Sequence, residues 1–246
     1  MDKALSHRPA HPGTHLCASE LEAYKKIAAG YARIENSIAV LSDLRSRKSH
    51  IYYGAAATVL GLGKQDAYRE IGSIWETEIL ERIHPDDRSR KYRQEWHFFQ
   101  YQQRLAPHKR PDHYLTGCLR LRDAAGRYRP VIHRIFYLSH PAAECSPELA
   151  LCLYNLSAEF TSQCFVTDTL NGHSFELAVP NSNSLLSDRE QEILRSIDTG
   201  KTSKIIANEL SISLHTVNRH RQNILHKLQA GNSIEACRVA KKLGWM

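Results

Sequence analysis

Residues 185–246 carry a series of helix-start signals that constrains the fold more than any other feature of the sequence. Side chains that can cap a helix stand at Ser187, Thr202, Ser213 and Asn232. Glu190 and Glu235 lie three residues after the first and the last of these, which is the spacing of a capping box. Apolar residues recur at helical spacing behind each cap. The pattern predicts an all-α arrangement of four short helices.

The two middle segments of this series differ in length. A short helix is expected after Thr202, followed by a tight turn at Ser211-Ile212 and a longer helix from Ser213 to about Leu228. This order is the layout of a helix-turn-helix. The longer helix would have about 15 residues and a length of about 22 Å. A helix of that diameter fits the major groove of DNA.

The longer helix has two different faces. The side expected to be buried carries Val217, Ile224 and Leu228. The opposite side carries Asn218, Arg219 and Gln222. Arginine suits the edge of guanine, and asparagine or glutamine suits the edge of adenine. We therefore predict that these three polar residues read DNA bases.

Predicted contacts to the DNA backbone surround this face, at Ser213, Thr216, His220, Asn223, Lys227 and Lys204. Residues 210–234 contain no Asp or Glu, although they include Arg219, Arg221 and Lys227. A basic stretch without acids on a helix is the electrostatic footprint of phosphate binding. Taken alone, the same charge also fits a solvated basic face.

The C-terminal segment resembles the DNA-binding domains of the LuxR/FixJ/NarL family. In the longer helix the matching positions are Ser213, Thr216-Val217, His220, Ile224 and Lys227-Leu228. Before it they are Leu186-Ser187, Arg189-Glu190, Gly200, Ile206-Ala207 and Leu210. The resemblance implies a four-helix domain that binds DNA as a homodimer, often through its final helix. It places base reading on Asn218, Arg219 and Gln222, and backbone contacts on Thr216, His220 and Lys227.

The chain departs from the family pattern at three positions. Lysine is common in the family where this chain has Asn218, so the resemblance implies no base preference. Ile205 stands where the family usually has a polar residue. Ser233 replaces a frequent arginine near the start of the last helix.

The first 160 residues show a different periodicity. A helix is expected over about 20–36, and further helices over about 74–83 and 86–104. Strands are expected at 38–41, 50–53, 113–122, 128–139 and 149–157, with a hairpin turn at Asp123–Gly126. A five-stranded antiparallel sheet with helices on one face fits this order. The fold class predicted for this part is α+β.

Residues 38–160 resemble a PAS domain. The segment Ile83-His84-Pro85-Asp86-Asp87 and the pair Gly126 and Tyr128 before a strand carry the resemblance. It implies a sensing or dimerising module with a small-molecule cavity. We predict no cofactor, and the sequence leaves a small-molecule ligand, haem or flavin open.

These patterns predict an order of five segments along the chain. They are a flexible tail at 1–18, an N-terminal helix at 19–37, the PAS-like domain at 38–160, a hairpin and linker at 161–184, and the helix-turn-helix domain at 185–246. A stripe of apolar residues on the N-terminal helix fits packing on its own domain or a dimer contact. The basic helix 88–104 contains aromatic residues that fit either packing on the sheet or a second nucleic-acid surface.

Composition excludes several other classes. Hydrophobic residues make up 42% of the 246 residues, but no apolar run approaches the ~18 residues that span a bilayer. The N-terminus lacks the apolar segment of a signal peptide, so we expect a cytoplasmic protein. The 6 cysteines form no C-x-x-C pair, so we expect free thiols and no metal site. His84, Asp86 and Asp87 could be an acid–base set, but acidic residues also favour a helix start.

The sequence also lacks a Gly-rich phosphate loop and an H-E-x-x-H motif, so we expect no enzyme. The prediction is a homodimeric, sequence-specific transcription regulator whose binding to double-stranded DNA is modulated by the PAS-like domain. RNA polymerase is a further expected partner, and no membrane is expected. The alternative is an adaptor whose basic helical domain contacts an acidic protein.

Overall fold

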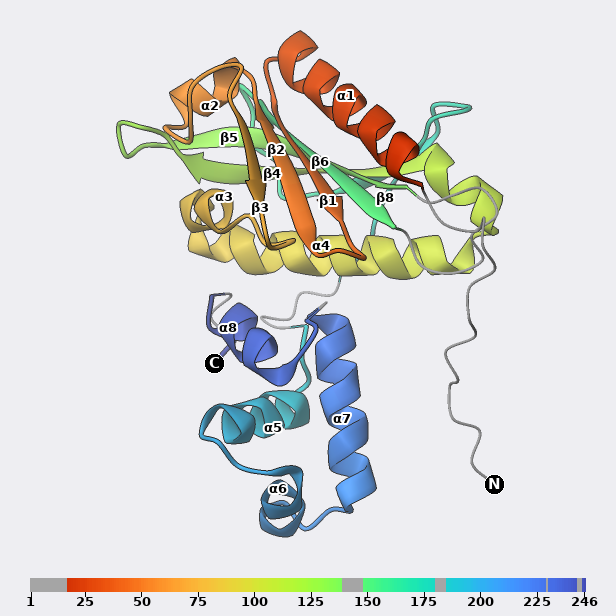
Figure 1. The fold of residues 1–246 in the computed structure, drawn as a ribbon, viewed down its shortest axis with the longest axis vertical. Helices are drawn as coiled ribbons and strands as arrows, with labels where there is room; N and C mark the ends of the chain where they lie inside the picture. The colour runs from red at the N-terminus through yellow and green to blue at the C-terminus, as the bar shows by residue number, and fades with distance from the viewer. Residues whose placement is uncertain (1–16, 139–147, 180–184, 229, 243–244) are drawn as a thin grey trace. The chain divides into compact units, whose positions relative to one another are not determined.

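The computed structural model describes residues 17–138, 148–179, 185–228, 230–242 and 245–246 (Figure 1). Its contacts divide the chain into two compact units, residues 1–84 with 97–177 and residues 85–96 with 178–246. Residues 1–16 of the predicted tail, 180–184 of the predicted linker and Cys145 lie outside the described residues.

An antiparallel sheet forms the centre of the first unit. Its strands are β1 (Ile38–Asp43), β2 (Lys48–Tyr53), β3 (Tyr68–Ile71), β4 (His113–Arg122), β5 (Tyr128–Leu138), β6 (Leu149–Leu156), β7 (Phe165–Asp168) and β8 (Ser174–Glu176). Their order in the sheet is β3-β2-β1-β6-β5-β4-β7-β8. Every neighbouring pair is antiparallel.

The prediction of five strands was wrong, because the described residues form an 8-stranded sheet. The predicted strands are its centre, β2-β1-β6-β5-β4. The short β3 at one edge is mostly exposed, so its side chains show no alternation that a sequence pattern could reveal. At the other edge, β7 and β8 form the expected hairpin, which joins the sheet through pairs such as Tyr114–Thr167. The paired strands β4 and β7 are far apart in the sequence, so a local sequence pattern does not predict their pairing.

Four α-helices and one 3-10 helix accompany the sheet in sequence. They are α1 (Ala18–Ile34), α2 (Ala55–Val59), α3 (Thr77–Arg82), α4 (Pro85–Arg104) and η1 (Pro107–Asp112). The first helix begins two residues before its predicted start, because the Glu20 carboxylate accepts a hydrogen bond from the Cys17 backbone N–H at 2.7 Å. The fourth helix begins at Pro85, with Asp86 and Asp87 in its first turn, where acidic residues favour the positive end of the helix dipole.

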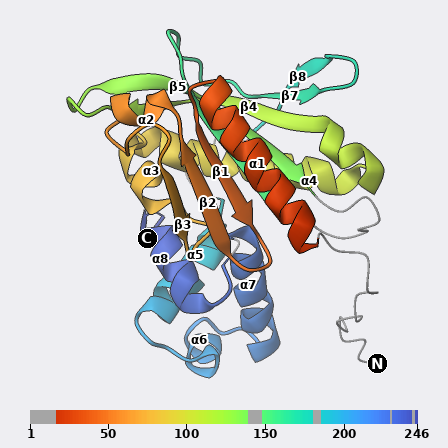
Figure 2. The ribbon, with the colours of Figure 1, turned by 45° about the horizontal axis from the view of Figure 1, so that its top comes forward.

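Helices pack against both faces of the sheet (Figures 1 and 2). On one face Ala28 and Ala32 of α1 pack in a cluster with residues of β1 and β6, and Phe136 of β5 lies beside them. Successive side chains of a strand point to opposite faces. Tyr137 therefore faces the other side, where it stacks with Phe98 of α4 at 5.6 Å between ring centroids. The expectation of helices on one face was wrong, because α1 has an alanine-lined side that fits closely on the sheet.

The second unit contains a bundle of short helices, α5 (Asp188–Asp198), α6 (Ser203–Glu209), α7 (Leu214–Lys227) and α8 (Ser233–Lys242). The predicted caps are present, because Ser187, Thr202 and Ser213 each accept a backbone N–H from the residue three positions later. Asn232 accepts the Glu235 N–H at 2.9 Å. The core is lined by Ile193, Leu194, Ile206, Val217, Ile224, Leu228, Ala236 and Ala240. The prediction of four short helices is confirmed.

Among the described residues, no helix is both long enough and apolar enough to cross a membrane.

Candidate nucleic-acid interface

The turn between α6 and α7 sets the position of the longer helix. Ser211 has a φ of 52°, which turns the chain sharply after α6. The Ile212 N–H returns to the Ala207 carbonyl at 3.0 Å. Ser213 then caps α7 by accepting the Thr216 N–H at 3.0 Å. The 14 residues of α7 give it a length of about 21 Å.

One side of α7 is buried and the other is exposed. Val217 and Ile224 are 0% and 1% exposed. Asn218, Arg219 and Gln222 are all exposed. At about 100° per residue, these three polar side chains lie within one arc opposite the buried pair. The structure therefore presents together the side chains predicted to read bases, and their role in reading bases stays a prediction.

The residues predicted to contact the DNA backbone differ in their surroundings. Lys204 and Asn223 are exposed, whereas Thr216 and His220 are half-buried. The hydroxyl groups of Ser213 and Thr216 are 2.8 Å apart, and the Ser213 hydroxyl also forms the helix cap. A phosphate at this end of α7 would meet the helix N-terminus, where backbone N–H groups and the helix dipole favour an anion.

Lys227, also a predicted backbone contact, has a partner inside the bundle. Its Nζ donates to Glu190 Oε2 at 2.7 Å, and the Glu190 side chain is only 4% exposed. The same oxygen accepts the Ser187 backbone N–H at 2.8 Å. This ion pair joins the C-terminal end of α7 to the start of α5. It fixes the orientation of the exposed face of α7.

Arg221 has a bracing role that was not predicted from the sequence. Its guanidinium group donates to the Ser203 hydroxyl at 3.1 Å and to the Ser233 hydroxyl at 2.9 Å. It thereby links α6, α7 and α8. The signal was available, because Arg221 lies four residues after Val217 and three before Ile224, on the buried side of the helix. A second brace, Arg189, donates to the Leu210 carbonyl at 2.9 Å.

The cysteines of the described residues carry free thiols. Cys237 of α8 is buried, with its Sγ 3.9 Å from the Leu194 carbonyl oxygen. Burial raises the pKa of this thiol. It therefore stays protonated near neutral pH and acts as a small core side chain.

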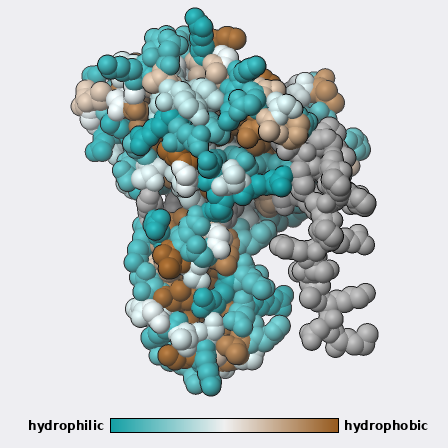
Figure 3. Space-filling view, in the orientation of Figure 1, coloured by the Kyte–Doolittle hydropathy of each residue, from teal (hydrophilic) through white to brown (hydrophobic). Residues whose placement is uncertain are grey.

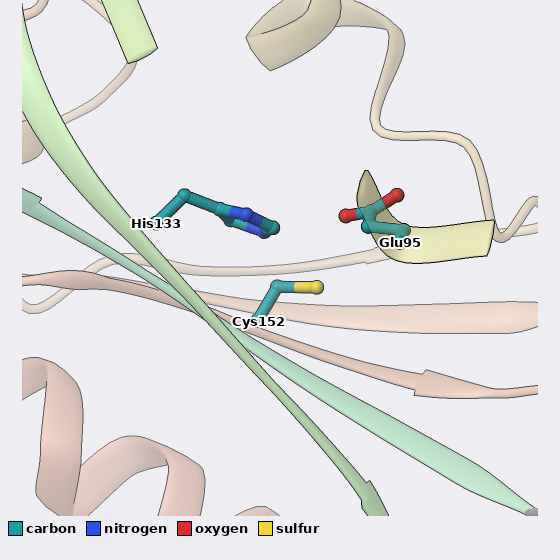
Figure 4. A group of neighbouring side chains, drawn as sticks. All are labelled: Glu95, His133 and Cys152. Carbon is teal, nitrogen blue, oxygen red and sulfur yellow. The ribbon is translucent and has the colours of Figure 1, made fainter. Parts of the chain in front are cut away.

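One group of potential metal ligands occurs among the described residues, formed by Glu95, His133 and Cys152 (Figure 4). One ligand atom from each lies within 4.8 Å of the others. His133 and Cys152 project from the same face of the neighbouring strands β5 and β6. The Glu95 carboxylate already accepts a hydrogen bond from Lys91 at 2.6 Å. We therefore assign no ion to this group.

Comparison with known proteins identifies the helical bundle. Residues 184–240 match the family model of bacterial regulatory proteins, luxR family. The uncharacterized response regulatory protein YgeK of Escherichia coli is 45% identical over 64 residues, which are 26% of this chain and 44% of YgeK. The transcriptional regulatory protein DesR of Bacillus subtilis is 47% identical over 60 residues, which are 24% of this chain and 30% of DesR. The chain thus matches less than half the length of either relative.

Among solved structures, a phage VqmA in complex with DPO is similar at a TM-score of 0.31 and 14% sequence identity, over 93% of this chain and 91% of that chain.

The capped helices, the tight turn and the two-faced α7 define the bundle as a helix-turn-helix domain. The family match over residues 184–240 makes it a LuxR-family domain.

Proposed function

We propose that the protein is a sequence-specific transcription regulator in which α7 enters the major groove and reads bases. The observation that supports this most strongly is the exposed set Asn218, Arg219 and Gln222 on a helix braced from behind. Arg221 and Lys227 hold the opposite side of α7 through hydrogen bonds to the other helices. Rigid positioning lowers the entropic cost of placing polar side chains against base edges.

Electrostatics support a polyanionic partner, and the polar side chains suited to base edges favour DNA over an acidic protein. Residues 210–234 contain no acidic residue, and Arg219 and Lys204 are exposed. We assign phosphate contacts to Ser213, Thr216, His220, Asn223 and Lys204. Lys227 would contribute its charge near the backbone while it holds Glu190. The names of DesR and YgeK, which describe regulatory proteins, agree with this proposal.

The regulatory part of the proposal concerns the first unit. We assign residues 38–160 to a PAS-like sensor and expect the regulator to act as a homodimer that contacts RNA polymerase. A signal changes DNA affinity only if it binds one state of the chain better than another. The resemblance of the Ile83–Asp87 segment to PAS domains supports this assignment.

The test is in-vitro selection of random duplex DNA by the purified full-length protein. Wild type should enrich a motif with two half-sites, and Arg219→Ala should lose or relax one position in each half-site. Arg195→Ala is the matched control, because Arg195 is an exposed arginine of α5 and its removal lowers the net charge equally. Circular dichroism would check that both variants are folded. The proposal would be contradicted if Arg219→Ala enriched the same motif as wild type and Arg195→Ala. It would also be contradicted if wild type enriched no motif.

A further inference from the structure

The hairpin formed by β4 and β5 ends in a turn with an excess of positive charge. Residues 122–129, which form the β4–β5 tip, contain three arginines and one acidic residue, Asp123. The arginine side chains are all exposed, and they belong to Arg122, Arg127 and Arg129. The acidic side chain is buried, at 4% exposed. The surface of the tip is therefore basic.

The β4–β5 tip lies at a corner of the sheet, where it forms a two-stranded ribbon. On one side β6 pairs with β5 only from Val131 onward, and on the other β7 pairs with β4 only over His113–Thr116. The ribbon therefore extends past its neighbouring strands (Figures 1 and 2). Figure 3 shows that polar residues cover most of the visible surface of this unit. The arginines of the tip are thus accessible to a partner.

Hydrogen bonds give the tip a fixed shape. The Oδ1 atom of Asp123 accepts the backbone N–H groups of Ala125 and Arg127, both at 2.9 Å. The Ala124 N–H donates to the Val59 carbonyl at 3.1 Å, which ties the turn to the end of α2. The turn is held by backbone groups and one carboxylate, so its shape does not depend on the exposed ends of the arginines. A pre-formed surface binds with a lower entropic cost.

Most of the positive charge at the tip has no carboxylate partner. The Oδ2 atom of Asp123 accepts a hydrogen bond from Arg129 at 3.0 Å and lies 3.6 Å from Nε of Arg127. A fourth arginine, Arg82 of α3, donates to backbone carbonyl oxygens of the tip. Neither Arg82 nor Arg122 forms an ion pair with a carboxylate within the part of the chain that the structure describes. Four arginines against one carboxylate leave three positive charges in excess.

We propose that the β4–β5 tip binds the phosphate backbone of the DNA duplex that α7 reads. Arginine guanidinium groups match phosphate oxygens through two parallel hydrogen bonds. A basic surface that neutralises phosphates also gains affinity by releasing counterions from the DNA. Once α7 has bound, phosphates of the same duplex are present at a high effective concentration around the chain, which favours them over a free acidic protein. The inference therefore deepens the proposed function and rests on it.

The test is the salt dependence of DNA binding by the full-length protein, with the selected operator and with an unrelated duplex of equal length. Arg122→Gln combined with Arg127→Gln removes two charges and leaves the backbone hydrogen bonds of the turn in place. Each phosphate contact contributes about 0.9 to the slope of log affinity against log salt concentration. The slope should fall by about 1.8 for each tip that contacts DNA. Between about 50 and 200 mM salt, wild type should then lose about twelvefold more affinity than the variant.

Two further variants serve as controls. Lys26→Gln combined with Arg33→Gln removes two exposed charges of α1 in the same unit, so it changes the net charge equally. This pair should keep the wild-type slope. Arg122→Lys combined with Arg127→Lys retains both charges and should keep most of the slope. Circular dichroism would check that all three double variants are folded.

Two results would overturn the inference. An unchanged slope in the glutamine variant of the tip would show that its arginines contact solvent or an acidic protein instead of DNA. An equal fall in the slope for the tip variant and the α1 control would show an effect of net charge rather than a contact.

The two duplexes separate this inference from the proposed function. Phosphate contacts carry no sequence information, so the ratio of affinities for the operator and the unrelated duplex should be the same in the tip variant and in wild type. A changed ratio would contradict a contact to phosphate alone. If wild type itself showed no preference for the operator, the proposed sequence-specific function would fail, whatever the slopes show.

Discussion

Replacing Lys227 by methionine is expected to destabilise the helical bundle more than replacing Glu190, its ion-pair partner, by glutamine. Lys227→Met leaves a carboxylate that is 4% exposed without its cation. Breaking a buried ion pair from one side costs about 3–5 kcal/mol. Because Ser187 still donates its N–H to Glu190 at 2.8 Å, we expect a loss of about 2–3 kcal/mol.

Glu190→Gln should cost only about 1 kcal/mol, because glutamine retains the capping box and water can hydrate the remaining ammonium group. The Lys227 side chain is 26% exposed, so water reaches it. The double variant should resemble Glu190→Gln, since it contains no unpaired buried charge.

Hydrogen exchange of the full-length chain measures this difference locally. Protection of the α5 and α7 amides should fall about 30- to 160-fold in Lys227→Met and about fivefold in Glu190→Gln, at 1.36 kcal/mol per tenfold. Amides of the sheet in the first unit should not change. Lys204→Met, which alters an exposed lysine of α6, is the control and should leave protection unchanged. Equal losses in the two variants, or a smaller loss in Lys227→Met, would refute this reasoning.

Three further predictions concern the stability of the fold. The Arg127 backbone N–H and the Arg129 guanidinium lower the pKa of Asp123, so its stabilisation is present above about pH 4 and is lost as pH falls through the lowered pKa. Asp123→Asn should therefore flatten the acid side of the stability profile in urea titrations, and an unchanged profile would contradict this. Gly54→Ala should cost about 1–3 kcal/mol in urea unfolding, because the added Cβ would lie 2.2 Å from the Ala32 carbonyl oxygen; a neutral effect would contradict the close approach. Ser213→Ala should cost about 1 kcal/mol, seen as faster exchange of the Thr216 amide, and unchanged exchange would argue against the cap.

The helical bundle could be predicted from sequence because its signals are local. A cap and the apolar residues behind it lie within a few positions of each other, so Ser187 with Glu190 and Ser213 with Val217 indicate helices without knowledge of the rest of the chain. The exposed side of α7 follows from the same periodicity. Asn218, Arg219 and Gln222 were therefore placed together correctly on one face.

Helical periodicity places Arg221 on the buried side of α7, but the partners that brace α7 could not be predicted in the same way. Lys227 and Glu190 are 37 residues apart, and Arg221 meets Ser203 and Ser233 across 18 and 12 residues. A basic residue has the same sequence signal whether it binds phosphate or a buried carboxylate. Only the packing of α5 against α7 distinguishes the two for Lys227.

Parts of the first unit could not be predicted from the sequence either. Strands of the centre have buried, apolar residues and are visible in the sequence, whereas β3 has exposed side chains. The start of α1 was misplaced because Cys17, a weak capping residue, stands where serine or aspartate is usual. The alternation of Phe136 and Tyr137 between two covered faces requires helices on both sides, which local periodicity does not specify.

The central claim is that the exposed side of α7 reads bases, and its most direct test is a ratio of affinities. Wild type and Arg219→Ala would be titrated with the selected operator and with a duplex changed at the base pair assigned to Arg219, across a range of salt. We predict that the variant loses about 1–3 kcal/mol of discrimination, or about 5- to 160-fold in the ratio, with little change in the salt slope. An equal loss of affinity for both duplexes, with a salt slope smaller by about one, would show that Arg219 contacts phosphate and would contradict the claim.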